Sequence, residues 1–173
     1  MLRATASAIL LSVVSPAGTP VNLDTFLDGQ ESCTASAAFA AFSDSLSERY
    51  SRQAGQAPPP RAGAKVTIPS EIRPAVGRAA WMDRGEYTEV RVPLVRTFRG
   101  LDVAEVEFAF GNGTGITAHQ IAFSTPLTEV ERRIGAAVGE GKKRMKEQSP
   151  EFDFTVELYE RDGRARLGCD RST

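Results

Sequence analysis

His119 is the only histidine of the chain, and histidine is the side chain best suited to acid–base catalysis near neutral pH. It alternates along one run with Ile121 and Phe123, so in a strand all three would share a face. We therefore expect His119 to be largely buried, with a hydrogen-bond partner but without a serine or carboxylate in catalytic geometry. The alternative is a general base in a small hydrolase, because the members of a catalytic triad come from distant positions.

Two pairs of carboxylates alternate along predicted strands: Glu105 with Glu107, and Asp153 with Glu157. A glycosidase needs two carboxyl groups at a set separation, one of them held protonated by apolar surroundings. Carboxylates on the polar face of a strand are usually solvated, so we expect these four to be exposed and without a catalytic role. No cofactor motif accompanies them, and we expect no cofactor.

The segment AFGNGTGI, residues 109–116, allows three interpretations. Its glycines could wrap a phosphate, Asn112 to Thr114 is a glycosylation sequon, and Asn-Gly is the strongest short signal for a hairpin. A phosphate loop needs a helix directly after the glycines, whereas a β-branched run follows here. We therefore expect a hairpin tip with Asn112 or Gly113 at positive φ. Whether the sequon is used stays open.

The chain has two cysteines, Cys33 and Cys169. An even pair in an exported chain indicates a disulfide, and this one would close nearly the whole domain. A loop of that length stabilises the fold by roughly 5 kcal/mol in the chain-entropy model. The alternative is two free thiols. We expect no metal site, because the chain has no C-x-x-C motif and only one histidine.

Trp81, Arg84 and Tyr87 surround a predicted turn at residues 83–85. Aromatic and arginine side chains anchor many protein interfaces, so these three are the candidate binding residues. The alternative is that they pack at the end of the sheet.

The first residues are typical of a secretory signal peptide. Arg3 precedes an apolar stretch over residues 4–14, and small residues follow at the spacing that signal peptidase accepts. We predict cleavage after Ala17, a lead-in over 18–30, and a single domain over 31–173 with a proline-rich linker at 51–64. The expected location is periplasmic or extracellular, and the layout resembles that of small bacterial exported proteins, a likeness that implies no activity.

Charge and hydropathy exclude several classes of protein. The net charge is −1 and the pI is about 5.9, whereas nucleic-acid binders usually carry a basic excess. No apolar run reaches the ~20 residues of a membrane helix, so we expect no transmembrane segment in the mature chain. A hydrophobic content of 41% is enough for a packed core.

The periodicity predicts an α+β fold: an antiparallel sheet of about four to six strands, including two hairpins, with two helices packed on one face. The helices are expected over 31–50, with Cys33 in the first turn, and from an N-cap at Thr125 to an end at Gly139. Strands are expected within 87–95, 101–110, 116–124, 152–159 and 164–169, and two further segments, 65–68 and 75–82, are strand candidates.

Two details refine the sheet. The alternation of apolar and polar residues changes phase near Ala104 and Glu105, and a β-bulge there would restore it. Pro93 indicates the edge of the sheet or the end of a strand. A two-residue turn at Asp162 and Gly163 would pair residue 158 with 167 and residue 156 with Cys169. Cys169 would then face the core, where a helix could bring Cys33 to it.

These features favour an exported, non-catalytic module that binds a protein or an envelope ligand. The alternatives are the small hydrolase that uses His119 and a structural component of the cell envelope. The first is preferred because few residue types suited to catalysis are present.

Overall fold

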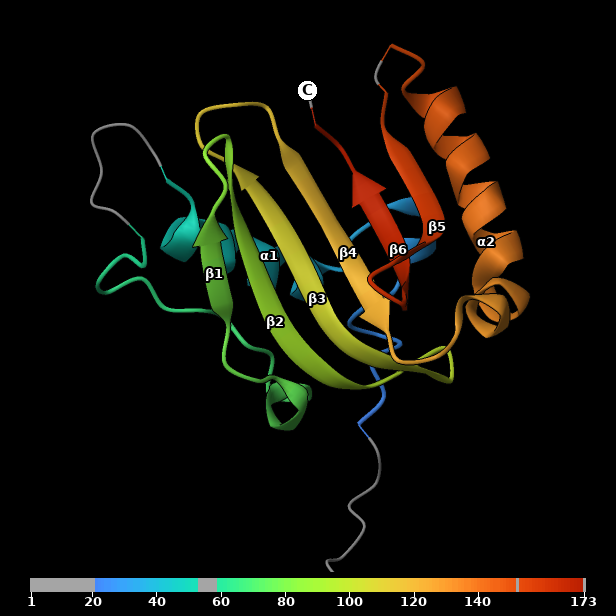
Figure 1. Cartoon of the computed structure of the whole chain (residues 1–173), viewed down its shortest axis with the longest axis horizontal. Helices are drawn as coiled ribbons and strands as arrows, with labels where there is room; N and C mark the ends of the chain where they lie inside the picture. The colour runs from blue at the N-terminus through green and yellow to red at the C-terminus, as the bar shows by residue number, and fades with distance from the viewer. Residues whose placement is uncertain (1–20, 53–58, 152, 173) are drawn as a thin grey trace, which may run out of the picture.

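A computed structural model describes residues 21–52, 59–151 and 153–172. In these residues the chain forms an α+β fold with one antiparallel sheet of six strands in the order β1-β2-β3-β4-β6-β5. Figure 1 shows α1 behind the sheet and α2 alongside β5. The elements are η1 (Gln30–Ser32), α1 (Ala37–Tyr50), η2 (Arg73–Ala75), β1 (Ala80–Asp83), β2 (Tyr87–Phe98), β3 (Leu101–Gly111), β4 (Thr117–Phe123), α2 (Leu127–Gln148), β5 (Thr155–Arg161) and β6 (Arg164–Asp170).

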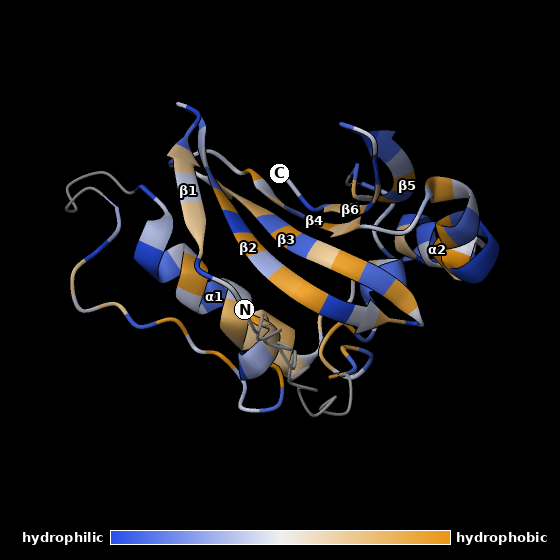
Figure 2. Cartoon of the chain, turned by 60° about the horizontal axis from the view of Figure 1, so that its bottom comes forward, coloured by the Kyte–Doolittle hydropathy of each residue, from blue (hydrophilic) through white to orange (hydrophobic). Residues whose placement is uncertain are grey.

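The core lies between the sheet and α1. Hydrophobic and polar residues alternate along β2 and β3, as the banding in Figure 2 shows, so each strand buries one set of side chains and leaves the other on the opposite face. On α1, Phe39, Phe42 and Leu46 are buried at helical spacing, and the rings of Phe39 and Phe42 contact the ring of Phe108 on β3. We call the face of the sheet turned away from α1 the open face.

The first helix begins later than predicted. α1 starts at Ala37 because the Ser36 hydroxyl accepts a hydrogen bond from the backbone N–H of Phe39, which caps the helix. Cys33 lies outside it, in a left-handed conformation at the end of η1 (φ 51°). The prediction that Cys33 occupies the first turn of the helix was therefore wrong, because a side-chain cap interrupts the alanine-rich run.

Two of the predicted strands differ from the structure. Residues 65–68 form no strand, because the segment runs past α1 and the Thr67 N–H donates to the hydroxyl of Ser45 on that helix. The strand expected within 75–82 is confirmed only at its end, as the edge strand β1. Upstream of β1, a single bridge from Val76 to Leu94 touches the sheet.

The bulge is confirmed at Ala104, which is the extra residue of β3 between two successive pairs with β4. Pro93 lies within β2 and not at its end, but β1 pairs only with residues 88–91 of β2. Beyond that point the outer side of β2 has no ladder partner, so a proline without an N–H is tolerated there. Its carbonyl accepts a hydrogen bond from Gly77.

The second helix is longer than predicted and begins one residue later. Pro126 is the N-cap, and the hydroxyl of Thr125 instead accepts a bond from the backbone of Asp102. The helix continues through Gly139, where no capping contact stops it, to Gln148. Its later turns pack on η1: a Cβ atom built on Gly141 would lie 2.0 Å from the carbonyl oxygen of Glu31. Only a glycine allows the two backbones to approach this closely.

The C-terminal hairpin confirms the predicted register. Leu158 pairs with Leu167 and Val156 with Cys169, and the turn residues Asp162 and Gly163 both have positive φ. Cys169 therefore faces the core, as expected.

The predicted disulfide is also confirmed. Cys33 and Cys169 are bonded with their Cα atoms 5.5 Å apart, which rules out two free thiols. The bond ties the η1 segment to β6.

The predicted signal peptide, residues 1–17, and the centre of the proline-rich linker, 53–58, lie outside the described residues. The described part of the lead-in is not peripheral, because Leu23, Phe26 and Leu27 are buried in the core. Among the described helices, none combines the length and hydropathy that a membrane span requires.

Candidate functional site

His119 lies on the core face of β4, where it pairs with Phe108 on one side and Cys169 on the other. Its ring centroid is 5.0 Å from that of Phe39, and its Nε2 atom shares a hydrogen bond with the side-chain oxygen of Gln30, which is itself buried. The only hydrogen bond of the His119 ring among the described residues is this one. A base without a neighbouring nucleophile or orienting carboxylate lacks the arrangement of a hydrolytic triad.

The surroundings of His119 also disfavour its charged form. Burial lowers the pKa of the imidazole from 6.5 to about 4, and the positive charge of Arg171 contributes to the same shift. At neutral pH the side chain is therefore uncharged and packs as a polar member of the core.

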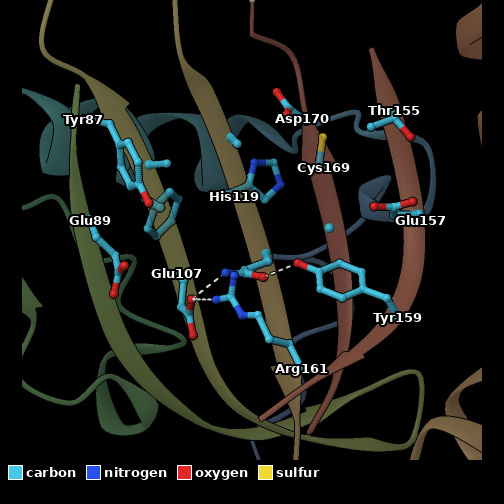
Figure 3. A pocket seen from close by; sticks show the side chains of 15 residues that line it. Tyr87, Glu89, Glu107, His119, Thr155, Glu157, Tyr159, Arg161, Cys169 and Asp170 are labelled. Carbon is cyan, nitrogen blue, oxygen red and sulfur yellow. Dashed lines mark hydrogen bonds and ion pairs between the residues drawn. The ribbon is translucent and has the colours of Figure 1, made fainter. Parts of the chain in front are cut away.

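A concave site lies on the open face, over β2 to β6 (Figure 3). It has a volume of about 240 Å³, and we call it the open-face hollow. Its floor is formed by Ala109, Ala118 and Gly168, on three adjacent strands. The small size of these three side chains creates the concavity, because the residues around them are large and polar.

Glu107 forms the centre of one wall. Its carboxylate accepts hydrogen bonds from Arg161, at 2.9 Å, from Arg166 and from the amide of Gln120. The side chains of Glu107 and Arg166 are both 2% exposed. The prediction that this glutamate is solvated was wrong, because two arginines from the C-terminal hairpin cover it. A buried carboxylate requires such partners.

Tyr159 completes this wall and lies across the sheet. Its hydroxyl donates to the Gln120 side-chain oxygen, which extends the hydrogen-bond chain from Glu107 (Figure 3). A Cβ atom on Gly168 would come within 2.9 Å of the tyrosine ring, so the ring lies directly over the glycine. Burial raises the pKa of the Tyr159 hydroxyl, which therefore stays protonated at neutral pH.

The opposite wall comes from β2. Glu89 is bracketed by Arg91, at 2.5 Å, and Arg84, at 3.0 Å. Burial works to raise the pKa of this carboxyl, but the hydrogen bonds from the two arginines outweigh it and hold the pKa below its usual range. Tyr87 adds an aromatic ring at the end of the same strand (Figure 3).

Two carboxylates of the open-face hollow have no such partner. Glu157 on β5 and Asp170 on β6 line it, and no described cation forms an ion pair with either. Both side chains are exposed, in agreement with the expectation for Glu157. Glu157 pairs with Gly168 while Asp170 pairs with Thr155, so the two carboxylates are diagonal neighbours on one face, roughly 7 Å apart at their Cα atoms.

The three candidate binding residues do not form one cluster. Tyr87 lines the open-face hollow, and Arg84 reaches it through its ion pair with Glu89. Trp81 pairs with Val90, whose side chain faces the core, and directly paired residues share a face of the sheet, so the indole lies on the core face and not on the open face. It is 39% exposed there.

The glycine-rich segment is the connection between β3 and β4, which confirms the hairpin. Gly113 has φ 84° and no helix follows, so the arrangement of a phosphate loop is absent. Asn112 is held on both sides of its amide group: its oxygen accepts from the Thr88 hydroxyl at 3.0 Å, and its nitrogen donates to the Gly85 carbonyl at 2.9 Å. The side chain thus links two turns at this end of the sheet.

Within residues 21–52, 59–151 and 153–172, no three His, Cys, Asp or Glu side chains are grouped closely enough to share a metal ion. Comparisons with protein-family models, with curated proteins and with solved structures find no significant match to this chain. A functional proposal for this chain therefore depends on the geometry of the open-face hollow.

The sequence did not reveal this site. It depends on the pairing of β6 between β4 and β5, which brings Gln120 between Glu107 and Gly168. One signal was present: alanine and glycine occupy the polar side of the alternation at Ala109, Ala118 and Gly168, where larger polar residues are more common.

Proposed function

We propose that the protein is an exported, non-catalytic binding module and that the open-face hollow holds its ligand. The observation that carries the proposal is the combination of an apolar floor with walls of polar groups fixed by mutual hydrogen bonds. Small-molecule sites typically have this composition, with a few polar groups in set positions. Export is supported by the disulfide, which forms in oxidising compartments, and by the signal-peptide pattern of residues 1–17.

The fixed walls favour binding over catalysis. Glu107 and Glu89 are each held by two arginines, so neither carboxylate is arranged to take a proton from a substrate. Tyr159 is held by Gln120. Groups that are already positioned lose little conformational freedom when a ligand arrives, which is the property of a preorganised site.

No specific observation favours the two alternatives. The hydrolase that uses His119 would need a nucleophile, whereas the imidazole faces two phenylalanine rings and Gln30. A structural role in the cell envelope has no feature of its own in the described residues.

The test is a ligand screen by thermal unfolding that compares the wild type with a variant whose hollow is filled by a larger side chain. A collection of small cationic, anionic and neutral compounds is added to the wild-type chain. A ligand at a concentration of about one hundred times its Kd should raise the unfolding midpoint by several degrees. Ala118→Phe fills the hollow and should abolish the rise. Ala137→Phe, at an exposed position of α2, is the matched control and should retain it.

If every active compound stabilises Ala118→Phe as much as the wild type, the ligand binds elsewhere and the proposal is wrong. If no compound stabilises the wild type, the open-face hollow has no small-molecule ligand of the classes tested.

A further inference from the structure

We infer that the ligand of the open-face hollow carries an organic cation, either a free amine or the side chain of a lysine or arginine in a peptide. The inference rests on the proposed function and adds the chemical class of the ligand. It follows from the two carboxylates of the walls that have no ion-pair partner, from the aromatic rings beside them and from the size of the site.

The lining is predominantly acidic. Four carboxylates line the hollow, those of Glu89, Glu107, Glu157 and Asp170, against the single guanidinium of Arg161. Arg161 already donates to Glu107, and the arginines behind the walls are committed to the two glutamates. The carboxylates of the lining without an ion-pair partner are those of Glu157 and Asp170, and the guanidinium of the neighbouring Arg171 stacks over the Phe154 ring instead of pairing with either. A cation is therefore the ligand that this side of the hollow lacks.

The spacing of these two carboxylates fits one cationic group between them. Diagonal neighbours on adjacent strands lie roughly 7 Å apart at their Cα atoms, and both side chains project from the same face of the sheet. Exposed carboxylates at that spacing can turn toward a single ammonium or guanidinium group placed between them. Thr155, the direct partner of Asp170, adds a hydroxyl to the same rim.

Aromatic rings stand on two sides of the hollow. Tyr87 and Tyr159 both line it, and Tyr159 lies over Gly168, next to Glu157 in the ladder. Tyrosine faces attract ammonium and guanidinium groups through their quadrupole. The alanine floor would receive the alkyl chain that carries the charge, which a bare metal ion does not have.

The size of the site sets the size of the ligand. A hollow of about 240 Å³ is smaller than the ~300–1,000 Å³ of sites for drug-sized molecules. It suits a short alkylamine or one basic side chain. Both sources carry the same group, and the experiment below separates them.

The test is calorimetric titration of the full mature chain with three probes of equal length: n-butylammonium, n-butanol and butyrate. Butylammonium should bind at least tenfold more tightly than the other two, and its affinity should fall as salt is added. Glu157→Gln and Asp170→Asn should each weaken it by up to about fivefold, and the double variant by more than tenfold. Glu160→Gln, an exposed carboxylate of the same strand on the other face, is the matched control and should change nothing.

A blocked Gly-Lys-Gly peptide identifies the source of the cation. Tighter binding of the peptide than of butylammonium indicates a protein partner, and weaker binding indicates a free amine. Tyr87→Leu should weaken both by about three- to tenfold through loss of the ring.

Two results would overturn the inference. The first is that butanol or butyrate binds as tightly as butylammonium and that Ala118→Phe abolishes this binding. The hollow would then be a binding site, but its ligand would not need a positive charge. The other is full affinity for butylammonium in the Glu157→Gln, Asp170→Asn double variant. Absence of binding by all three probes, together with an inactive screen, would count against the binding site itself.

Discussion

The two most unusual side chains of this protein, His119 and Glu107, are ionisable groups packed into the sheet, where Glu107 is buried and His119 is half-buried. His119 is held neutral by burial, and Glu107 is held charged by two arginines. The contrast follows from their partners. A neutral imidazole needs one hydrogen bond, which Gln30 supplies, whereas a buried carboxylate needs opposite charge.

The lowered pKa of His119 makes stability depend on pH. Because the folded pKa is about 4 and the ordinary value is 6.5, the unfolded chain binds the proton first as the pH falls. The contribution of the neutral imidazole is complete above pH 6.5 and is lost as the pH falls toward 4. The free energy of unfolding of the wild type should therefore fall more steeply than that of His119→Gln, by on the order of 2 to 3 kcal/mol between pH 7 and pH 4.

Urea unfolding of both proteins at intervals of half a pH unit gives this comparison. Carboxylates titrate in both chains, so the difference between the two curves isolates residue 119. Parallel curves would mean that the imidazole is solvated and not buried.

Asn112 should contribute to stability through the two turns that it joins. Asn112→Ala removes the acceptor for the Thr88 hydroxyl and the donor to the Gly85 carbonyl. We expect a loss of about 1 to 3 kcal/mol in the free energy of unfolding, because the Thr88 side chain is buried and would lose its partner. Chemical unfolding measures the change. In a Thr88→Val background the hydroxyl is already absent, so Asn112→Ala should cost less there; an equal cost would show that the contact with Thr88 contributes nothing.

At the scale of the elements, the packing of α2 on η1 explains why the helix runs past its first glycines. Gly139 is exposed with open space around it, whereas Gly141 meets the backbone of Glu31 and Ser32. Gly141→Ala should therefore destabilise the fold by about 1 to 3 kcal/mol, since η1 must move to admit the methyl group. Gly139→Ala should stabilise it by up to about 1 kcal/mol through helix propensity.

The pair of glycine variants is its own control, because both add one methyl group to the same helix two residues apart. Thermal unfolding of the two proteins is sufficient. Stabilisation by both substitutions would show that α2 does not pack closely against η1.

The elements differ in how far the sequence predicts them. Alternation along β3, β4 and the C-terminal hairpin is local, so the bulge at Ala104 and the register of Cys169 could be predicted. The end of α2 could not, because Gly139 and Gly141 are the same residue type and only the packing of η1 distinguishes them. The segment 65–68 has the composition of a strand, but it bonds to Ser45 of α1 instead of a neighbouring strand.

The open-face hollow likewise combines a residue that the sequence could suggest with residues that only long-range pairing brings together. Tyr87 was a candidate from its residue type alone, but Glu157 and Asp170 become neighbours only when β5 and β6 pair. Burial of Glu107 depends on Arg161 and Arg166, which are more than fifty residues away in the chain. Long-range pairing of charges leaves no periodic signal in a single sequence.

At the scale of the whole molecule, one covalent bond connects the two ends of the described domain. The Cys33–Cys169 disulfide spans 136 residues and fastens η1, and with it α2, to β6. Closing a loop of this length restricts the unfolded chain, and the stabilisation is up to roughly 5 kcal/mol. Reduction of the wild type should therefore lower the urea midpoint strongly.

The double variant Cys33→Ser, Cys169→Ser controls for effects of the reductant. It should unfold at the lower midpoint with or without reductant. Equal midpoints for the oxidised wild type and this variant would show that the bond does not restrain the unfolded chain.

The whole-molecule arrangement also leaves the sheet with one face covered by the core and one face free for the proposed ligand. α1 and the lead-in residues cover the apolar side, and the polar side carries a concave surface lined by residues of five strands. If this surface, the open-face hollow, is the proposed binding site, a ligand must perturb its residues first.

The most direct test is an amide chemical-shift map of the isotopically labelled chain during titration with n-butylammonium. We expect saturable shifts confined to the floor and rim of the hollow, at Ala109, Ala118, Gly168 and Asp170, with Trp81 and α1 unaffected. Saturable shifts centred on Trp81 or on α2, with the hollow unchanged, would contradict this expectation.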